Sequence, residues 1–203
     1  MAGIIYTSFS FLGNNAVEVK IEEWRNSLRS IQNLDNLAEQ EAKLREVYYS
    51  GYEGEIDFGA SSVDYKGDFH FESRSSPPLG IQDRILLLLA EIDPNVVVSI
   101  CYNKDDATEG YRYIVLDKFG EIFDNALGEV DGSDLDCVEI DEDDEDDEDQ
   151  EHGQKNEAMI EFRLNQLEAV RDLAEDFKGS RAYLKSEIKW IRREISDLKK
   201  QKS

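Results

Sequence analysis

The chain contains few of the residues that form cross-links, rigid turns or metal sites: its 203 residues include 2 Cys, 3 Pro and 2 His. Cys101 lies in an apolar run and Cys137 in an acidic tract, so we expect two unpaired thiols in a reducing compartment. The longest apolar run, residues 85–90, is far shorter than the ~20 residues that span a membrane. The N-terminus also lacks the basic segment of a secretory signal. These absences predict a soluble, cytoplasmic protein.

Sequence motifs for catalysis and for cofactor binding are missing as well. The chain has no Gly-x-Ser-x-Gly elbow, no phosphate loop and no dinucleotide fingerprint. His70 lies in a strand pattern and His152 follows the acidic tract, and neither has a second ligand at metal-binding spacing. Residues 131–136 alternate acids around a glycine, but not in the order of a calcium-binding loop. We therefore expect a non-enzymatic protein with no catalytic residue, metal or cofactor.

Lys and Arg are absent from residues 129–151, which contain 15 Asp and Glu residues. The whole chain has a net charge of −23. Nine acids follow one another from Asp141 to Asp149. Such a run has little apolar surface to bury and its charges repel one another, so it is not expected to fold alone. The sequence thus predicts an α+β domain at 1–128, a disordered acidic linker at 129–154 and a helical module at 155–203.

Periodicity within the first 128 residues alternates between strands and helices. Residues 3–12 alternate aromatic and β-branched side chains, which predicts a first strand. Val17, Ile21 and Trp24 begin a helical stripe that continues, after a bend, to residue 48. Further strands are expected at 55–58, 63–72, 96–102, 111–117 and 122–123, with a buried helix at 81–92. This order predicts a ferredoxin-like antiparallel sheet with its helices on one face.

One segment in this domain suggests a relationship. Phe69 to Pro78 form a strand that ends at Ser76-Pro77-Pro78, and a later strand with Tyr111 and Tyr113 leads to Phe119-Gly120-Glu121. In these features the domain resembles the YubB-like ferredoxin-fold family of plasmid and phage proteins. The resemblance covers roughly residues 3–123 and implies a ferredoxin-like fold and an origin in a mobile genetic element. It implies no particular chemistry.

The last 49 residues show a heptad pattern from Ile160 to Leu198. Its unbroken spacing favours one continuous helix, whereas Gly179-Ser180 leaves a helical hairpin open. A homodimeric coiled coil would bury the seam, and packing on the first domain is the alternative. The residues expected to mediate self-association are Leu167, Val170, Phe177, Leu184, Ile188, Ile191, Ile195 and Leu198.

The excess of acids favours a basic protein as partner and disfavours direct binding to nucleic acid or membranes. We expect the protein to inhibit or sequester a basic, nucleic-acid-binding host defence protein, by an acidic surface that mimics DNA. The alternative is an oligomeric scaffold in which the acidic tract is only a solvated linker. The candidate partner-binding acids are Asp57, Asp64, Asp68, Glu72, Asp105, Asp106, Glu109, Asp141, Glu142, Asp143 and Asp144.

Overall fold

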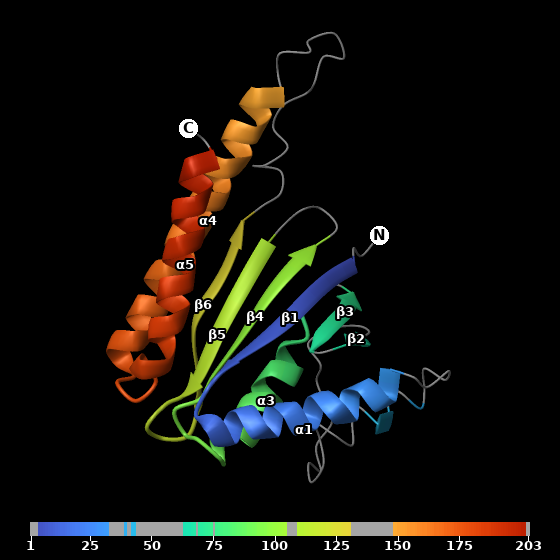
Figure 1. Ribbon diagram of the computed structural model, residues 1–203. Coiled ribbons are helices and arrows are strands. Elements are labelled where there is room, and N and C mark those ends of the chain that lie inside the picture. Colours follow the sequence, from blue (N-terminus) through green and yellow to red (C-terminus); the bar gives the residue numbers. More distant parts are fainter. Residues whose placement is uncertain are drawn as a thin grey trace.

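The computed structural model describes residues 4–32, 39, 42–43, 63–67, 69–74, 76–104, 109–130 and 148–201. Six strands form one sheet in these residues (Figure 1). The α+β class predicted from the sequence is confirmed. The strands are β1 (Ile4–Leu12), β2 (Val63–Gly67), β3 (His70–Arg74), β4 (Val97–Lys104), β5 (Glu109–Leu116) and β6 (Ile122–Val130).

The strand order across the sheet is β2-β3-β1-β4-β5-β6, and every neighbouring pair is antiparallel. With the helices α1 (Asn15–Gln32) and α3 (Leu79–Ala90), the part from β1 to β4 follows the element order β-α-β-β-α-β that is typical of ferredoxin-like domains. β5 and β6 extend the sheet beyond β4. The strand expected at residues 55–58 lies outside the described residues.

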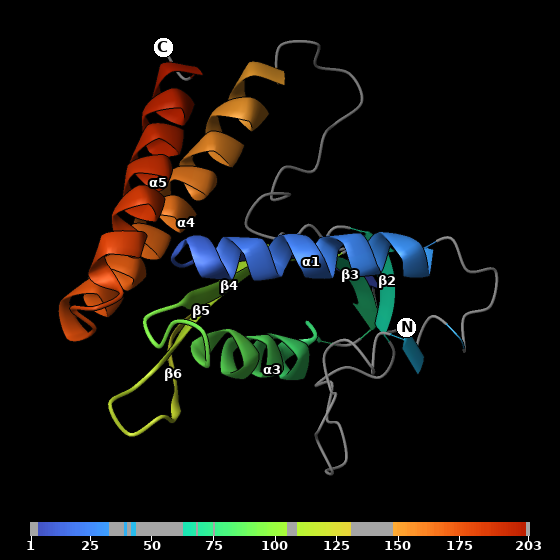
Figure 2. The same ribbon diagram turned by 60° about the horizontal axis from the view of Figure 1, so that its bottom comes forward.

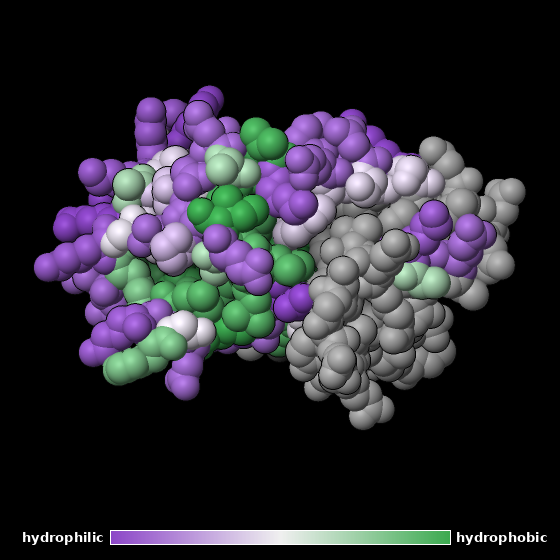
Figure 3. All heavy atoms as spheres, turned by 90° about the horizontal axis from the view of Figure 1, so that it is seen from below, coloured by the Kyte–Doolittle hydropathy of each residue, from purple (hydrophilic) through white to green (hydrophobic). Residues whose placement is uncertain are grey.

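α1 and α3 cover one face of the sheet, which we call the first face (Figure 2). Asn14 caps α1, because its Oδ1 accepts hydrogen bonds from the backbone N–H groups of Ala16 and Val17. Seen from below, apolar residues gather in one area of the surface beside polar residues (Figure 3). The helical residues buried against the first face are Val17, Ile21, Trp24, Ile81, Ile85, Leu86 and Leu89. They confirm the start of the first predicted stripe and the predicted buried helix, and the continuation of the first stripe to residue 48 lies largely outside the described residues.

The C-terminal segment is a hairpin of two helices, α4 (Glu148–Asp176) and α5 (Arg181–Gln201). The favoured prediction of one continuous helix is wrong, and the hairpin alternative is confirmed. The turn is held by the Ser180 hydroxyl, which donates to the carbonyl of Asn95 at 2.9 Å. A Cβ on Gly179 would meet the Asn95 side chain, so a larger residue there would have to displace that side chain.

The hairpin packs on the opposite side of the sheet, which we call the second face (Figure 1). The domain's own helices, α1 and α3, thus lie on one face as predicted, and the C-terminal module covers the other face, which is the alternative to a homodimeric coiled coil. The physical reason is that Val97, Tyr111, Tyr113 and Val115 present large apolar groups on the second face, and these require a cover.

The predicted self-association seam lies in this second core. Val170, Leu184, Ile191 and Ile195 are buried there, and Leu167, Phe177 and Ile188 are partly buried against them. Leu198 is partly exposed near the end of α5. Because the chain's own sheet covers the seam, the seam does not require a second copy to bury it.

The acidic tract connects β6 to α4. β6 runs to Val130 and α4 begins at Glu148, so both ends of the expected linker belong to these elements. Residues 131–147 lie outside the described residues. Among the helices that the structure describes, none is long and apolar enough to cross a membrane.

Candidate functional site

The second face of the sheet is only partly covered by the α4–α5 hairpin. Over β5 and β6, the rings of Tyr111 and Phe162 lie 5.3 Å apart and those of Phe123 and Phe177 lie 4.8 Å apart. Over β1 and β3, the same face is accessible: Tyr6 is 48 % exposed and His70 is exposed. We call this uncovered part, formed by Tyr6, Ser8, His70, Glu72, Cys101, Asn103 and Glu109, the open half.

The strand register places the acidic residues Glu72 and Glu109 of the open half in one row across the sheet, together with Asp64 of β2. Asp64 pairs with Glu72, Glu72 with Tyr6, Tyr6 with Asn103, and Asn103 with Glu109. Directly paired residues of antiparallel strands belong to the same face. Three strand spacings separate Glu72 from Glu109, which corresponds to about 14 Å.

A second row lies one step along the strands and consists of His70, Ser8 and Cys101. The members of the two rows on β3, β1 and β4 line a surface hollow of about 360 Å³, which Asp64 and Glu109 do not reach. Its lining combines an aromatic ring, a hydroxyl, an imidazole, a carboxylate and an amide, from Tyr6, Ser8, His70, Glu72 and Asn103. Such a surface can donate and accept hydrogen bonds and contact a cation.

The open half does not have the features of a nucleophilic active site. The crowded surroundings of the exposed Cys101 thiol raise its pKa to about 11, although Arg163 acts in the opposite direction. The thiol is therefore protonated at neutral pH. His70 lies two strands away, about 10 Å at the backbone, which is too far for a cysteine–histidine pair. Among the described residues, no group of three or more His, Cys, Asp or Glu could hold a metal ion.

The predicted acidic residues are only partly placed by the structure. Glu72 in β3 and Glu109 in β5 are partly exposed on the open half. Asp64 belongs to β2 and joins their row by its register. The structure thus brings three of the predicted residues together. Asp57, Asp68, Asp105, Asp106, Asp141, Glu142, Asp143 and Asp144 lie outside the described residues.

A buried polar network forms the boundary between the open half and the hairpin. The Tyr113 hydroxyl donates to Glu187 Oε1 at 2.7 Å and accepts from Gln166 Nε2 at 2.6 Å. Arg163 donates to Gln166 Oε1 at 2.8 Å and lies over the rings of Phe162 and Trp190. The network connects β5, α4 and α5, and so fixes the hairpin at the edge of the open half.

Burial changes the acidity of this network. It raises the pKa of Glu187, although the hydrogen bond from Tyr113 and the charge of Arg163 partly oppose the change. The pKa of the Tyr113 hydroxyl is also raised, first by burial and then by the nearby charge of Glu187. Tyr113 therefore stays protonated and donates its hydrogen bond throughout the neutral range.

Arg112, the neighbour of Tyr113 in β5, organises the first face instead. Its guanidinium donates to Asp124 and Asp83, each at 2.7 Å, and to Gln82 Oε1 at 3.1 Å. Gln82 in turn donates to the carbonyls of Val98 and Arg112. These contacts satisfy the buried guanidinium and join α3 to β5 and β6, so we assign this cluster a structural role.

Neither network has a local signal in the sequence. Tyr111, Tyr113 and Val115 alternate with Arg112 and Ile114, which places the two sets on opposite faces of a strand. Tyr113, however, lies 53 residues from Gln166 and 74 from Glu187. No local pattern connects residues so distant in the sequence.

No family model, no curated protein and no solved structure matches this chain. The function of the open half is therefore inferred from its own geometry and charge.

Proposed function

We propose that the protein is a non-enzymatic binding protein whose open half takes a short basic segment of a partner protein. The observation that carries the proposal is the row of Asp64, Glu72, Tyr6, Asn103 and Glu109 on an uncovered sheet face. The carboxylates of Glu72 in β3 and Glu109 in β5 can accept hydrogen bonds from lysine or arginine side chains of the partner. The exposed ring of Tyr6 adds a surface on which a cation can stack.

The charge density of this row favours a short basic peptide as its ligand, rather than a protein groove that normally binds duplex DNA. From Asp64 to Glu109 the row spans four strand spacings, or about 19 Å. A duplex of that length carries about eleven phosphates, whereas the row contains three acidic residues, Asp64, Glu72 and Glu109. The row therefore fits a few cations. The density required for DNA mimicry is found in the sequence of the acidic tract, with its nine consecutive acids.

The biological role that we propose is inhibition or sequestration of a basic, nucleic-acid-binding host defence protein. Two features of the sequence support it: the net charge of −23, and the resemblance of residues 3–123 to the YubB-like family of mobile elements. In this account the open half contacts a basic segment of the partner, and the acidic tract adds attraction at longer range. The scaffold alternative rested on the heptad seam, which packs within the chain.

Binding to a hexalysine peptide, measured by calorimetry, tests the proposal. Because the acidic tract would bind the same peptide, the nine acids at 141–149 are first replaced by Asn and Gln. In that background, the double variant Glu72→Gln and Glu109→Gln is expected to weaken binding about tenfold, since charge-assisted contacts are lost.

The matched control is Glu91→Gln with Glu121→Gln, two exposed acids outside the open half. It changes the net charge equally and is expected to leave the affinity within about twofold, because long-range effects of single surface charges are screened. Equal weakening by both pairs would contradict a localised site, and so would binding that persists unchanged in about 0.5 M salt.

A further inference from the structure

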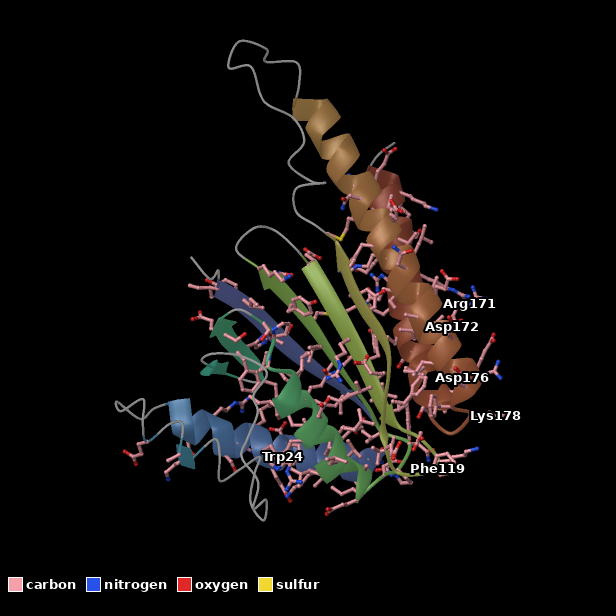
Figure 4. All side chains as sticks on the ribbon, turned by 180° about the vertical axis from the view of Figure 1, so that it is seen from behind. Trp24, Phe119, Arg171, Asp172, Asp176 and Lys178 are labelled. Carbon is pink, nitrogen blue, oxygen red and sulfur yellow. The ribbon has the colours of Figure 1, made fainter. Side chains whose placement is uncertain are left out.

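The outer side of the α4–α5 hairpin, which faces away from the sheet, carries two charged stripes. On α4, Phe162, Gln166 and Val170 are buried toward the sheet, and acids occupy the opposite side of the helix. Arg171 and Asp172 project from the hairpin away from the strands (Figure 4). The acidic stripe consists of Glu161, Glu168, Asp172 and Glu175, all exposed.

The second stripe is basic and lies on α5. Tyr183 and Glu187 reach toward the sheet side, where their oxygens bond Asp93 and Tyr113. At 100° per residue, the opposite side of the helix holds cations. The basic stripe consists of Arg181, Lys185, Lys189 and Arg192, all exposed. The outer surface therefore carries mainly acids on α4, with Arg171 as an exception, and bases on α5.

The two stripes are matched in level along the hairpin. α4 ends at Asp176 and α5 begins at Arg181. Asp172 and Lys185 are each four residues from those ends, and Glu168 and Lys189 are each eight residues from them. Among the described residues, none of the four is in an ion pair. Their charges thus remain available to another molecule.

We infer that this outer surface binds a second copy of the same chain, forming a two-fold dimer in which the hairpins make a four-helix bundle. A two-fold axis parallel to the helices places the acidic stripe of each copy opposite the basic stripe of the other. In this arrangement α4 of one copy faces α5 of the other, and the two helices run in opposite directions with their residues at matching levels. Asp172 therefore meets Lys185 and Glu168 meets Lys189, twice in each dimer. Because the two stripes carry opposite charges at matched levels, the surface is complementary to itself and so fits a second copy.

An exposed apolar residue on the same surface also favours binding of a second copy. Leu164 lies within the acidic stripe and is 46 % exposed. It lines a hollow of about 340 Å³ together with Leu167, Glu168 and Arg171. A side chain of the second copy can enter this hollow and add apolar contact to the charged contacts.

The dimer is expected to be weak, because exposed ion pairs contribute little each and because each of the two chains carries a net charge of −23. At about 0.15 M salt the Debye length is about 8 Å, which screens the overall repulsion but leaves direct contacts. Association should therefore be visible by sedimentation equilibrium of the full chain at that salt concentration, and lost at about 1 M salt, where the Debye length is about 3 Å.

Charge reversal of one stripe tests the arrangement. Lys185→Glu with Lys189→Glu makes the outer surface acidic, and Glu168→Lys with Asp172→Lys makes it basic. Each double variant alone is expected to weaken self-association more than about tenfold, because like charges meet at every contact. An equimolar mixture of the two is expected to form a 1:1 heterodimer, since complementary stripes meet again.

Lys118→Glu, at an exposed position in the turn between β5 and β6, serves as control and should leave self-association unchanged. Circular dichroism checks that both double variants remain folded. The inference is overturned if the full chain is monomeric at about 0.15 M salt. It is also overturned if both double variants still dimerise alone, or if the mixture of folded variants stays monomeric.

Discussion

The two halves of the second sheet face differ in what they carry and in what covers them. Under the hairpin, Val97, Tyr111, Tyr113 and Val115 are at most 3 % exposed. On the open half, the equivalent positions of β1 and β3 are Ser8, His70 and Glu72, which are polar or acidic, and Tyr6, whose aromatic ring is exposed. The backbone is one continuous sheet, so the difference lies in the side chains. Apolar positions determine where the hairpin packs, and polar positions leave the remaining surface accessible.

β4 contains the transition between the two halves. On its second face Val97 and Ser99 are buried, whereas Cys101 and Asn103 are exposed. The Tyr113 network lies beside this transition and satisfies the polar groups that the hairpin buries there. The boundary of the candidate site is therefore built by specific hydrogen bonds as well as by apolar packing.

The largest difference between the halves should appear when the hairpin packing is broken. Leu173 in α4 is fully buried in the second core, and Leu173→Ala is expected to lower the free energy of unfolding by about 2–5 kcal/mol. Val19→Ala, at a 62 % exposed position of α1 outside both proposed binding surfaces, is the control and should change it by less than about 0.5 kcal/mol. Urea denaturation followed by circular dichroism measures both, and equal effects would show that the hairpin does not pack as described.

A smaller effect is expected at the boundary network. Tyr113→Phe removes the hydroxyl that Glu187 and Gln166 share, and leaves both buried groups with one partner fewer. The expected loss is about 1–3 kcal/mol. Tyr6→Phe makes the same chemical change on the open half and should alter the free energy of unfolding by no more than about 0.5 kcal/mol. A stable Tyr113→Phe variant would mean that the network contributes nothing to docking.

The smallest effect is a difference in pH dependence between two carboxyls. Burial raises the pKa of Glu187 above its usual 4.5, so the folded protein holds this proton more tightly than the unfolded chain. Its contribution to stability is fully present below pH 4.5 and is lost as the pH rises through the folded pKa. Relative to the unsubstituted chain, Glu187→Gln should therefore gain stability as the pH rises.

Asp93 should behave in the opposite way. Burial alone would raise its pKa, but hydrogen bonds from the Tyr183 hydroxyl and from the backbone N–H groups of Asn95 and Asn14 outweigh burial and lower the pKa. Its contribution is present above pH 3.8 and is lost as the pH falls through the folded pKa. Asp93→Asn should thus be most destabilised at neutral pH. Denaturation curves from pH 3 to 8 compare the two variants, and slopes of the same sign would contradict this account.

The sequence predicted the local elements well because their signals are local. The spacing of Val17, Ile21 and Trp24 gave the buried side of α1, and the alternation in β5 separated its two faces. The hairpin was predicted less well because residues 177–180 replace about one helical turn. The seam therefore runs from Phe177 through Arg181 to Leu184 without a change of spacing.

The candidate site could not be predicted from the sequence, because it is formed by residues that are distant from one another in the chain. Glu72 and Glu109 were candidates because they are acidic, but only the strand order brings them into one row. The attachment of the hairpin turn to Asn95 joins residues 85 apart. Periodicity indicates that a surface is apolar or charged, and tertiary packing decides which of these surfaces is covered.

The most direct test of the central claim, that the open half is a binding surface, is a nuclear magnetic resonance titration of the chain with neutralised acids at 141–149. With hexalysine peptide as the probe, the account predicts that the largest amide shifts occur at Tyr6, Ser8, Glu72 and Asn103. Shifts spread evenly over the domain, or concentrated on α1 and α3, would contradict it.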